Sequence, residues 1–102
     1  MAIVKITKEN YEQEVLKSES TVLLDFYADW CGPCRMVGPV VEEIAEENAN
    51  IKVGKINVDE QMELAMQFKV TSIPLLVVMK DGQIVEQALG ARPKNQILAM
   101  IP

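Results

Sequence analysis

The sequence predicts an α/β domain in which a mixed sheet carries helices on both faces, in the order βαβαβαββα. Three observations support this prediction. Residues 21–28, TVLLDFYA, form a near-continuous apolar run of strand length, which is typical of a strand covered on both faces. From Pro33 onward, apolar residues recur with a helical period. Asp81-Gly82 separates two strand-like segments and is the clearest hairpin signal in the chain.

The first half of the chain begins with an alternating segment, residues 2–6, which predicts a short strand. Residues 8–18 predict a helix capped by Thr7, with Tyr11, Val15 and Leu16 near one face. The central strand follows at 21–28. Pro33 suits the first turn of the next helix, whereas Pro39 lies inside the helical pattern and is expected to kink it.

The next two elements are a third strand and a short helix. Residues 51–58, IKVGKINV, predict the strand. Asp59 is expected to start a helix through residues 60–68, with Met62, Ala65 and Met66 facing inward. Helical connections between the first strands predict that these strands are parallel.

The last third of the chain predicts a hairpin and a final helix. Residues 74–80 and 83–90 form the antiparallel pair around Asp81-Gly82. Pro93 then opens the last helix, with Ile97, Leu98 and Ile101 on one side.

Length and composition predict one domain spanning residues 1–102. The apolar fraction of 49% and the charged fraction of 25% are ordinary for a folded globule. The net charge is −5 and the ten basic residues are scattered, which argues against a nucleic-acid surface. No apolar run approaches the roughly 20 residues of a membrane helix, and the N-terminus does not look like a signal peptide. We therefore expect a cytoplasmic monomer that is not associated with a membrane.

The only two cysteines, Cys31 and Cys34, are separated by Gly32 and Pro33 alone. One interpretation is half of a metal site, but a closed zinc site takes four Cys or His ligands and the chain has no histidine. Carboxylates or a second chain would have to complete it. A second interpretation is a structural disulfide, which would contribute only about 2 kcal/mol because the closed loop is so short.

The third interpretation is a redox pair. Cysteines at positions i and i+3 of a helix lie on the same side, so their sulfur atoms can bond with little backbone movement. Cys31 would sit at the helix start, where free N–H groups and the helix dipole favour a thiolate. Cys34 would lie one turn inward and be more shielded. Without histidine, His-assisted hydrolysis is excluded, and activation must come from the helix end and a cation such as Arg35.

Trp30 and the cysteine pair complete the motif WCGPC, within the longer stretch DFYADWCGPC. Further along the chain stand GKINVD, IPLL, KDG and the Gly-Ala pair before the last helix. On these motifs together, the chain resembles the thioredoxin family over its whole length. The resemblance implies the thioredoxin fold, a mixed five-stranded sheet flanked by four helices. It also implies a protein-disulfide reductase whose redox-active disulfide joins Cys31 and Cys34. Thioredoxin reductase and disulfide-containing proteins are the implied partners. We expect no cofactor in the chain itself, since it lacks a Gly-rich nucleotide motif.

Asp25 is an acid among apolar neighbours, which is costly unless another group pairs with it. One interpretation is an internal ion pair with Lys55 of the adjacent strand. The resemblance favours another: Asp25 is the proton acceptor for Cys34, and Lys55 tunes it. We expect burial to raise the pKa of this carboxyl group.

The resemblance also implies a substrate-binding surface beside the disulfide. Pro74 would follow a cis peptide bond, and the backbone of Ile73 would pair with an extended substrate segment. Trp30 could instead be a core anchor. The chain departs from the family pattern at Leu75, Tyr27 and Gly38. The flat apolar surface would comprise Trp30, Gly32, Pro33, Ile73, Pro74, Gly90 and Ala91.

Two rival functions remain open at this point. A disulfide-forming or isomerising member of the same fold would use the same cysteines, although the Gly-Pro linker resembles the reducing members. A binding subunit of a larger assembly would use only the apolar surface, independently of redox chemistry.

Overall fold

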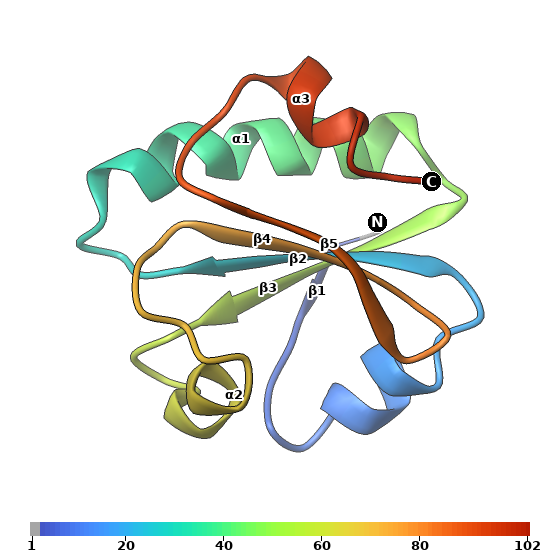
Figure 1. Cartoon of the computed structure of the whole chain (residues 1–102), viewed down its shortest axis with the longest axis horizontal. Coiled ribbons are helices and arrows are strands. Elements are labelled where there is room, and N and C mark those ends of the chain that lie inside the picture. The colour runs from blue at the N-terminus through green and yellow to red at the C-terminus, as the bar shows by residue number, and fades with distance from the viewer. Residues whose placement is uncertain (1–2) are drawn as a thin grey trace.

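The computed structural model describes residues 3–102, which form one open five-stranded sheet with helices on both faces (Figure 1). This confirms the predicted α/β class and element order. Ala2, the first residue of the predicted strand 2–6, lies outside the described residues. The elements are β1 (Ile3–Lys5), η1 (Glu12–Leu16), β2 (Thr21–Tyr27), α1 (Gly32–Glu47), β3 (Ile51–Asn57), α2 (Met62–Gln67), β4 (Leu75–Lys80), β5 (Gln83–Leu89) and α3 (Lys94–Leu98).

The strands lie in the order β1-β3-β2-β4-β5, so β2 is central. β3 pairs in parallel with both β1 and β2, whereas β4 is antiparallel to β2 and β5. The near-continuous apolar sequence of β2 is explained by this position, because its five middle residues are all buried.

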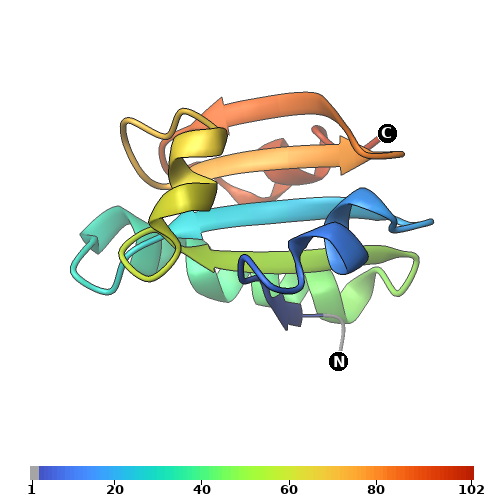
Figure 2. The ribbon, with the colours of Figure 1, turned by 90° about the horizontal axis from the view of Figure 1, so that it is seen from below.

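Alternate residues of the central strands point to opposite faces and build two cores. Leu24 and Phe26 pack on the side of η1 and α2, with Tyr11 and Leu64. Leu23 packs on the other side against α1 and α3, with Ile44 and Ile97. Figures 1 and 2 show these two layers of helices on opposite faces of the sheet. Asp25 has the same parity as Leu23 and therefore faces α1.

The hairpin between β4 and β5 has the predicted two-residue turn. Asp81 has φ 53° and Gly82 has φ 77°, the two positive angles that a type I′ turn requires. Aspartate tolerates this conformation better than most residues and glycine adopts it freely, which explains why this dipeptide is a strong signal.

Three helices differ from their predicted form. The first is a short π-helix, η1; Thr7 instead stabilises the preceding turn, where its Oγ1 accepts from the N–H of Asn10 at 3.3 Å. In α2 the inward prediction for Met62 and Met66 is wrong, since both side chains are exposed. In α3, Ile97 is buried but Leu98 is exposed. Each of these two short helices buries a single side chain, Leu64 in α2 and Ile97 in α3. Because one buried residue defines no repeat, the spacing of apolar residues predicts poorly which face of such a helix points inward.

Among the helices of residues 3–102, none is long and apolar enough to cross a lipid bilayer.

Candidate active site

The two cysteines form a disulfide at the start of α1. Their Cα atoms are 5.3 Å apart, within the ordinary range for a disulfide. Cys31 is the N-cap residue of the helix, and its Sγ accepts a hydrogen bond from the backbone N–H of Cys34 at 3.2 Å. Pro33 occupies the first turn, where its missing N–H leaves no lost helical hydrogen bond. One sulfur is therefore held directly over the free amide end of a 16-residue helix.

Burial does not distinguish the two sulfur-bearing residues. Cys31 is 4% exposed and Cys34 is 5% exposed, so the expectation that Cys34 is more shielded is wrong. Both cysteines pack against Ala28 and the half-buried side chains of Val58 and Ile73. The difference between them lies in the amide contact to Cys31, not in solvent exposure.

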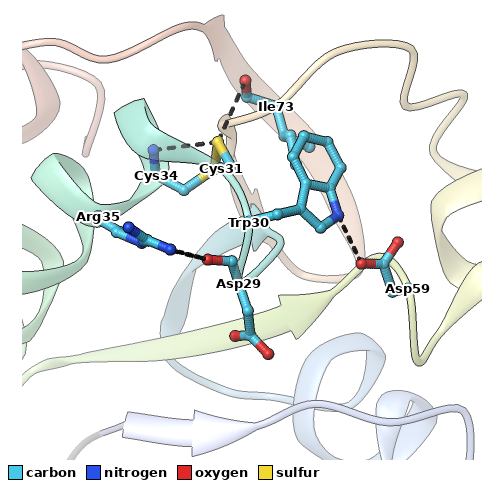
Figure 3. Close-up of a disulfide and its surroundings, with 7 residues drawn as sticks. All are labelled: Asp29, Trp30, Cys31, Cys34, Arg35, Asp59 and Ile73. Atoms are coloured by element: carbon cyan, nitrogen blue, oxygen red, sulfur yellow. Dashed lines mark hydrogen bonds between the residues drawn. A yellow bond between two sulfur atoms is a disulfide. The ribbon is translucent and has the colours of Figure 1, made fainter.

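The loop before β4 brings a second segment to the disulfide (Figure 3). The Ile73–Pro74 peptide bond is cis, as the resemblance implies. The carbonyl oxygen of Ile73 lies 3.9 Å from Sγ of Cys31. This contact is a hydrogen bond only when the sulfur is a protonated thiol, since a disulfide sulfur has no hydrogen to donate. The carbonyl of Pro74 accepts the N–H of Gly90 at 2.8 Å, so three segments distant in sequence meet here.

Trp30 is 69% exposed, which rules out the core-anchor interpretation. Its indole Nε1 donates to Oδ2 of Asp59 at 2.8 Å, so the ring is held at the surface beside the disulfide (Figure 3). Sequence reasoning assigned Asp59 only a helix start. The signal was available: Trp30 and Asp59 follow parallel neighbouring strands, whose carboxyl ends share one edge of the sheet.

Asp25 is fully buried, and within residues 3–102 neither carboxyl oxygen has a hydrogen-bond partner. Burial raises the pKa of Asp25 from 3.8 to about 6, while the charge of Lys55 acts in the opposite direction. A carboxyl group with such a pKa exchanges a proton near neutral pH.

Lys55 is the register partner of Asp25 across β2 and β3. It does not form the direct ion pair considered from sequence. Its Nζ lies 3.8 Å from Oε2 of Glu42 on α1 and 4.8 Å from the ring centre of Tyr27. Tyr27 thus supplies an aromatic ring for a cation–π contact with Lys55. The ammonium group lowers the pKa of Asp25 by its charge alone, while it contacts Glu42 and Tyr27.

A surface groove gives solvent access to Cys34 on the side of Lys55. Gly38 forms part of it, and a Cβ at this position would lie 3.6 Å from Nζ of Lys55, an ordinary contact. The groove is lined by Tyr27, Ala28, Asp29, Cys34, Arg35, Gly38, Pro39, Glu42 and Lys55.

Leu75, which also departs from the family pattern, is 8% exposed and packs in the core beneath η1 and α2.

Arg35 is committed to the backbone beside the site. Its Nη2 and Nε donate to the carbonyl of Asp29 at 2.8 and 3.3 Å (Figure 3). Arg35 therefore holds the backbone of Asp29, the residue before Trp30. The sequence predicted a different role for this cation, the activation of the thiol.

A disulfide between residues 31 and 34, an amide-bound sulfur and a buried acid with a raised pKa define a thiol–disulfide exchange site. The fold and the site together therefore define a protein of the thiol–disulfide oxidoreductase class.

Comparison with known proteins identifies the family. The model of the family described as Thioredoxin matches residues 2–102. Thioredoxin 1 of Nostoc sp. is 48% identical over 97 residues, covering 94% of this chain and 91% of that protein. Thioredoxin of Bacillus subtilis is 46% identical over 102 residues, covering 99% and 96%. Thioredoxin 1 of Synechococcus elongatus is 50% identical over 93 residues, covering 90% and 87%. The chain belongs to the thioredoxin family, and it is a protein-disulfide oxidoreductase.

Proposed function

We propose that this protein reduces disulfides in other proteins, with Cys31 as the nucleophile and Cys34 as the resolving thiol. The observation that carries this proposal is the N-cap position of Cys31, whose sulfur receives the backbone N–H of Cys34 at 3.2 Å. An amide donor and the positive end of a helix dipole both stabilise a thiolate more than a thiol. The Gly-Pro linker supports the reducing direction.

The reaction consists of two exchange steps. In the dithiol form, the Cys31 thiolate attacks one sulfur of a partner disulfide. A bond forms between Cys31 and that sulfur, the partner's S–S bond breaks, and the first partner thiolate leaves and takes a proton from water. Cys34, once deprotonated, then attacks Sγ of Cys31. The Cys31–Cys34 bond forms, the second partner thiolate leaves, and two electrons have passed to the partner.

Asp25 serves as the proton acceptor for Cys34, directly or through a water molecule. A buried carboxyl group with a pKa of about 6 supports this role, because it is mostly ionised at neutral pH yet basic enough to take a proton. The solvent-accessible groove that Cys34 lines supports the approach of water to this cysteine. Lys55 tunes the acid through its charge.

Partners dock on the apolar surface around the disulfide. The exposed indole of Trp30 and the cis Ile73–Pro74 bond support this assignment, with the backbone of Ile73 available to an extended segment. A thioredoxin reductase restores the dithiol, with electrons from NADPH through a flavin or from ferredoxin. The docking surface comprises Trp30, Gly32, Pro33, Ile73, Pro74, Gly90 and Ala91.

Residues 1–102 are proposed to act as a single thioredoxin domain and as a cytoplasmic monomer. The continuous sheet and the match over residues 2–102 support the single domain.

The proposal is tested by two cysteine variants in an insulin-reduction assay with dithiothreitol. Cys31→Ser should abolish reduction, and Cys34→Ser should accumulate a mixed disulfide that mass spectrometry detects. If Cys31→Ser kept wild-type activity, the assignment of the nucleophile would be wrong. A reduction potential measured against glutathione separates a reductant from a disulfide-forming protein. Complementation by the double Cys→Ser variant would instead favour a binding subunit.

A further inference from the structure

We propose that Arg92 is a positioning residue for protein substrates, because its guanidinium group fixes the peptide unit between Leu89 and Gly90. This inference rests on the proposed function, since it concerns the surface on which partners dock. Arg92 touches no reacting atom, and it acts through the backbone of the loop that joins β5 to α3.

The peptide unit between Leu89 and Gly90 is bonded at both ends. Its carbonyl oxygen, on Leu89, accepts from Nη2 of Arg92 at 2.8 Å. Its N–H, on Gly90, donates to the carbonyl of Pro74 at 2.8 Å. A longer bond of 3.5 Å joins Nε of Arg92 to the carbonyl of Gly90. One guanidinium group thus reaches two successive carbonyls, which the planar fork of arginine permits.

Side-chain packing does little to fix the chain at Gly90. Gly90 has φ +94°, and apart from its two chain neighbours no atom of residues 3–102 lies within 4 Å of the position that a Cβ would occupy. Glycine also loses more backbone freedom on folding than any other residue. The neighbouring Leu89 side chain is 55% exposed. Hydrogen bonds rather than packing must therefore fix the conformation at Gly90.

The bond from Arg92 also strengthens the contact with Pro74. A charged donor on a peptide oxygen polarises the peptide unit and makes its N–H a better donor. That N–H holds Gly90 against Pro74, and the adjacent Ile73 carbonyl lies 3.9 Å from Sγ of Cys31. Arg92 thereby sets the spacing between two segments of the docking surface.

The test compares Arg92→Ala and Arg92→Lys with Lys80→Ala, which removes one positive charge at the far end of β4. Insulin reduction is measured at varied insulin concentration, and amide exchange at Gly90 is followed by NMR. For Arg92→Ala we expect a rise of about tenfold in KM, the loss expected for one charge-assisted hydrogen bond, with kcat changed by less than about twofold. Exchange at Gly90 should accelerate by a similar factor. Arg92→Lys should fall between Arg92→Ala and the wild type, and Lys80→Ala should match the wild type.

Unchanged KM, or unchanged exchange at Gly90, in Arg92→Ala would overturn the proposal. So would an equal effect from Lys80→Ala, which would indicate charge alone, or a loss confined to kcat. If Arg92→Ala did not fold, Arg92→Lys would decide by the same two readouts. A wild-type protein unable to reduce insulin would refute the proposed function instead, and exchange at Gly90 would still show whether Arg92 holds the peptide unit.

Discussion

Asp25 is the residue at which folding and chemistry conflict most clearly. A fully buried carboxyl group without a hydrogen-bond partner destabilises the folded protein once it is ionised. Lys55 compensates only in part, because its ammonium group pairs with Glu42 and lies over the ring of Tyr27. Such a residue is explained by function better than by stability.

The first prediction concerns Asp25→Asn, which imitates the protonated acid. The pKa of the Asp25 carboxyl group is 3.8 when the group is exposed to water, as in the unfolded chain, and about 6 in the folded protein. The folded protein therefore binds this proton more tightly than the unfolded chain does. Stability from this group is therefore greatest at low pH and falls as the pH rises from about 4 to about 6. At about pH 8 the substitution should raise the free energy of unfolding by about 3 kcal/mol.

Urea denaturation of the oxidised protein at about pH 4 and about pH 8 measures this difference. The gain should fall to about 0.5 kcal/mol at the lower pH, where the acid is mostly protonated in the folded protein and roughly half ionised in the unfolded chain. Glu19→Gln, at an exposed acid, serves as the control and should change little at either pH. An equal gain for Asp25→Asn at both pH values would contradict the assigned titration.

The second prediction concerns Lys55→Met. The charge of Lys55 lowers the pKa of Asp25 against the effect of burial, so removing that charge should raise this pKa further. NMR titration of the Asp25 carboxyl group measures the change. Lys52→Met is the matched control on the same strand, since Lys52 pairs with Glu14 at 3.0 Å. A pKa of Asp25 that did not rise in Lys55→Met would show that Lys55 does not tune it.

At the scale of the elements, β3 depends on one glycine. β3 lies between β1 and β2, and Gly54 faces the side chains of Ile6 and Leu24. A Cβ at Gly54 would lie 2.7 Å from Cγ1 of Ile6 and 3.0 Å from Cδ2 of Leu24, closer than carbon atoms normally approach. The absence of a side chain here allows the two larger residues to fill the core beneath η1.

The third prediction follows from that contact. Gly54→Ala should lower the free energy of unfolding by about 1–3 kcal/mol, because the added methyl group overpacks the core. Gly32→Ala is the control for stability, since outside its own helical turn no atom of the described residues lies within 4 Å of the position that its methyl group would occupy. Equal urea midpoints for Gly54→Ala and Gly32→Ala would show that the core adjusts without cost.

At the scale of the whole molecule, the sequence predicted those features that local chemistry determines. The apolar run of β2, the Asp81-Gly82 turn and the helix after Pro33 each carry a local signal, and together they predicted the order of the elements. The contact of Trp30 with Asp59 depends on where two loops meet, and that of Arg92 with Leu89 depends on the backbone path of one irregular loop. Hydrophobic periodicity carries no information on such contacts. The exposed Met62 and Met66 likewise reflect the shortness of α2, in which Leu64 alone is buried.

In the proposed function, the fold keeps the Cys31 sulfur as a reactive thiolate at the N-terminal end of α1. The most direct test is alkylation of the reduced protein with iodoacetamide at neutral pH, with each cysteine followed by mass spectrometry. We expect Cys31 to react at least about tenfold faster than Cys34, because only the thiolate is nucleophilic. Faster reaction at Cys34, or equal rates at both cysteines no greater than that of free cysteine, would contradict the statement that the end of α1 stabilises the Cys31 thiolate.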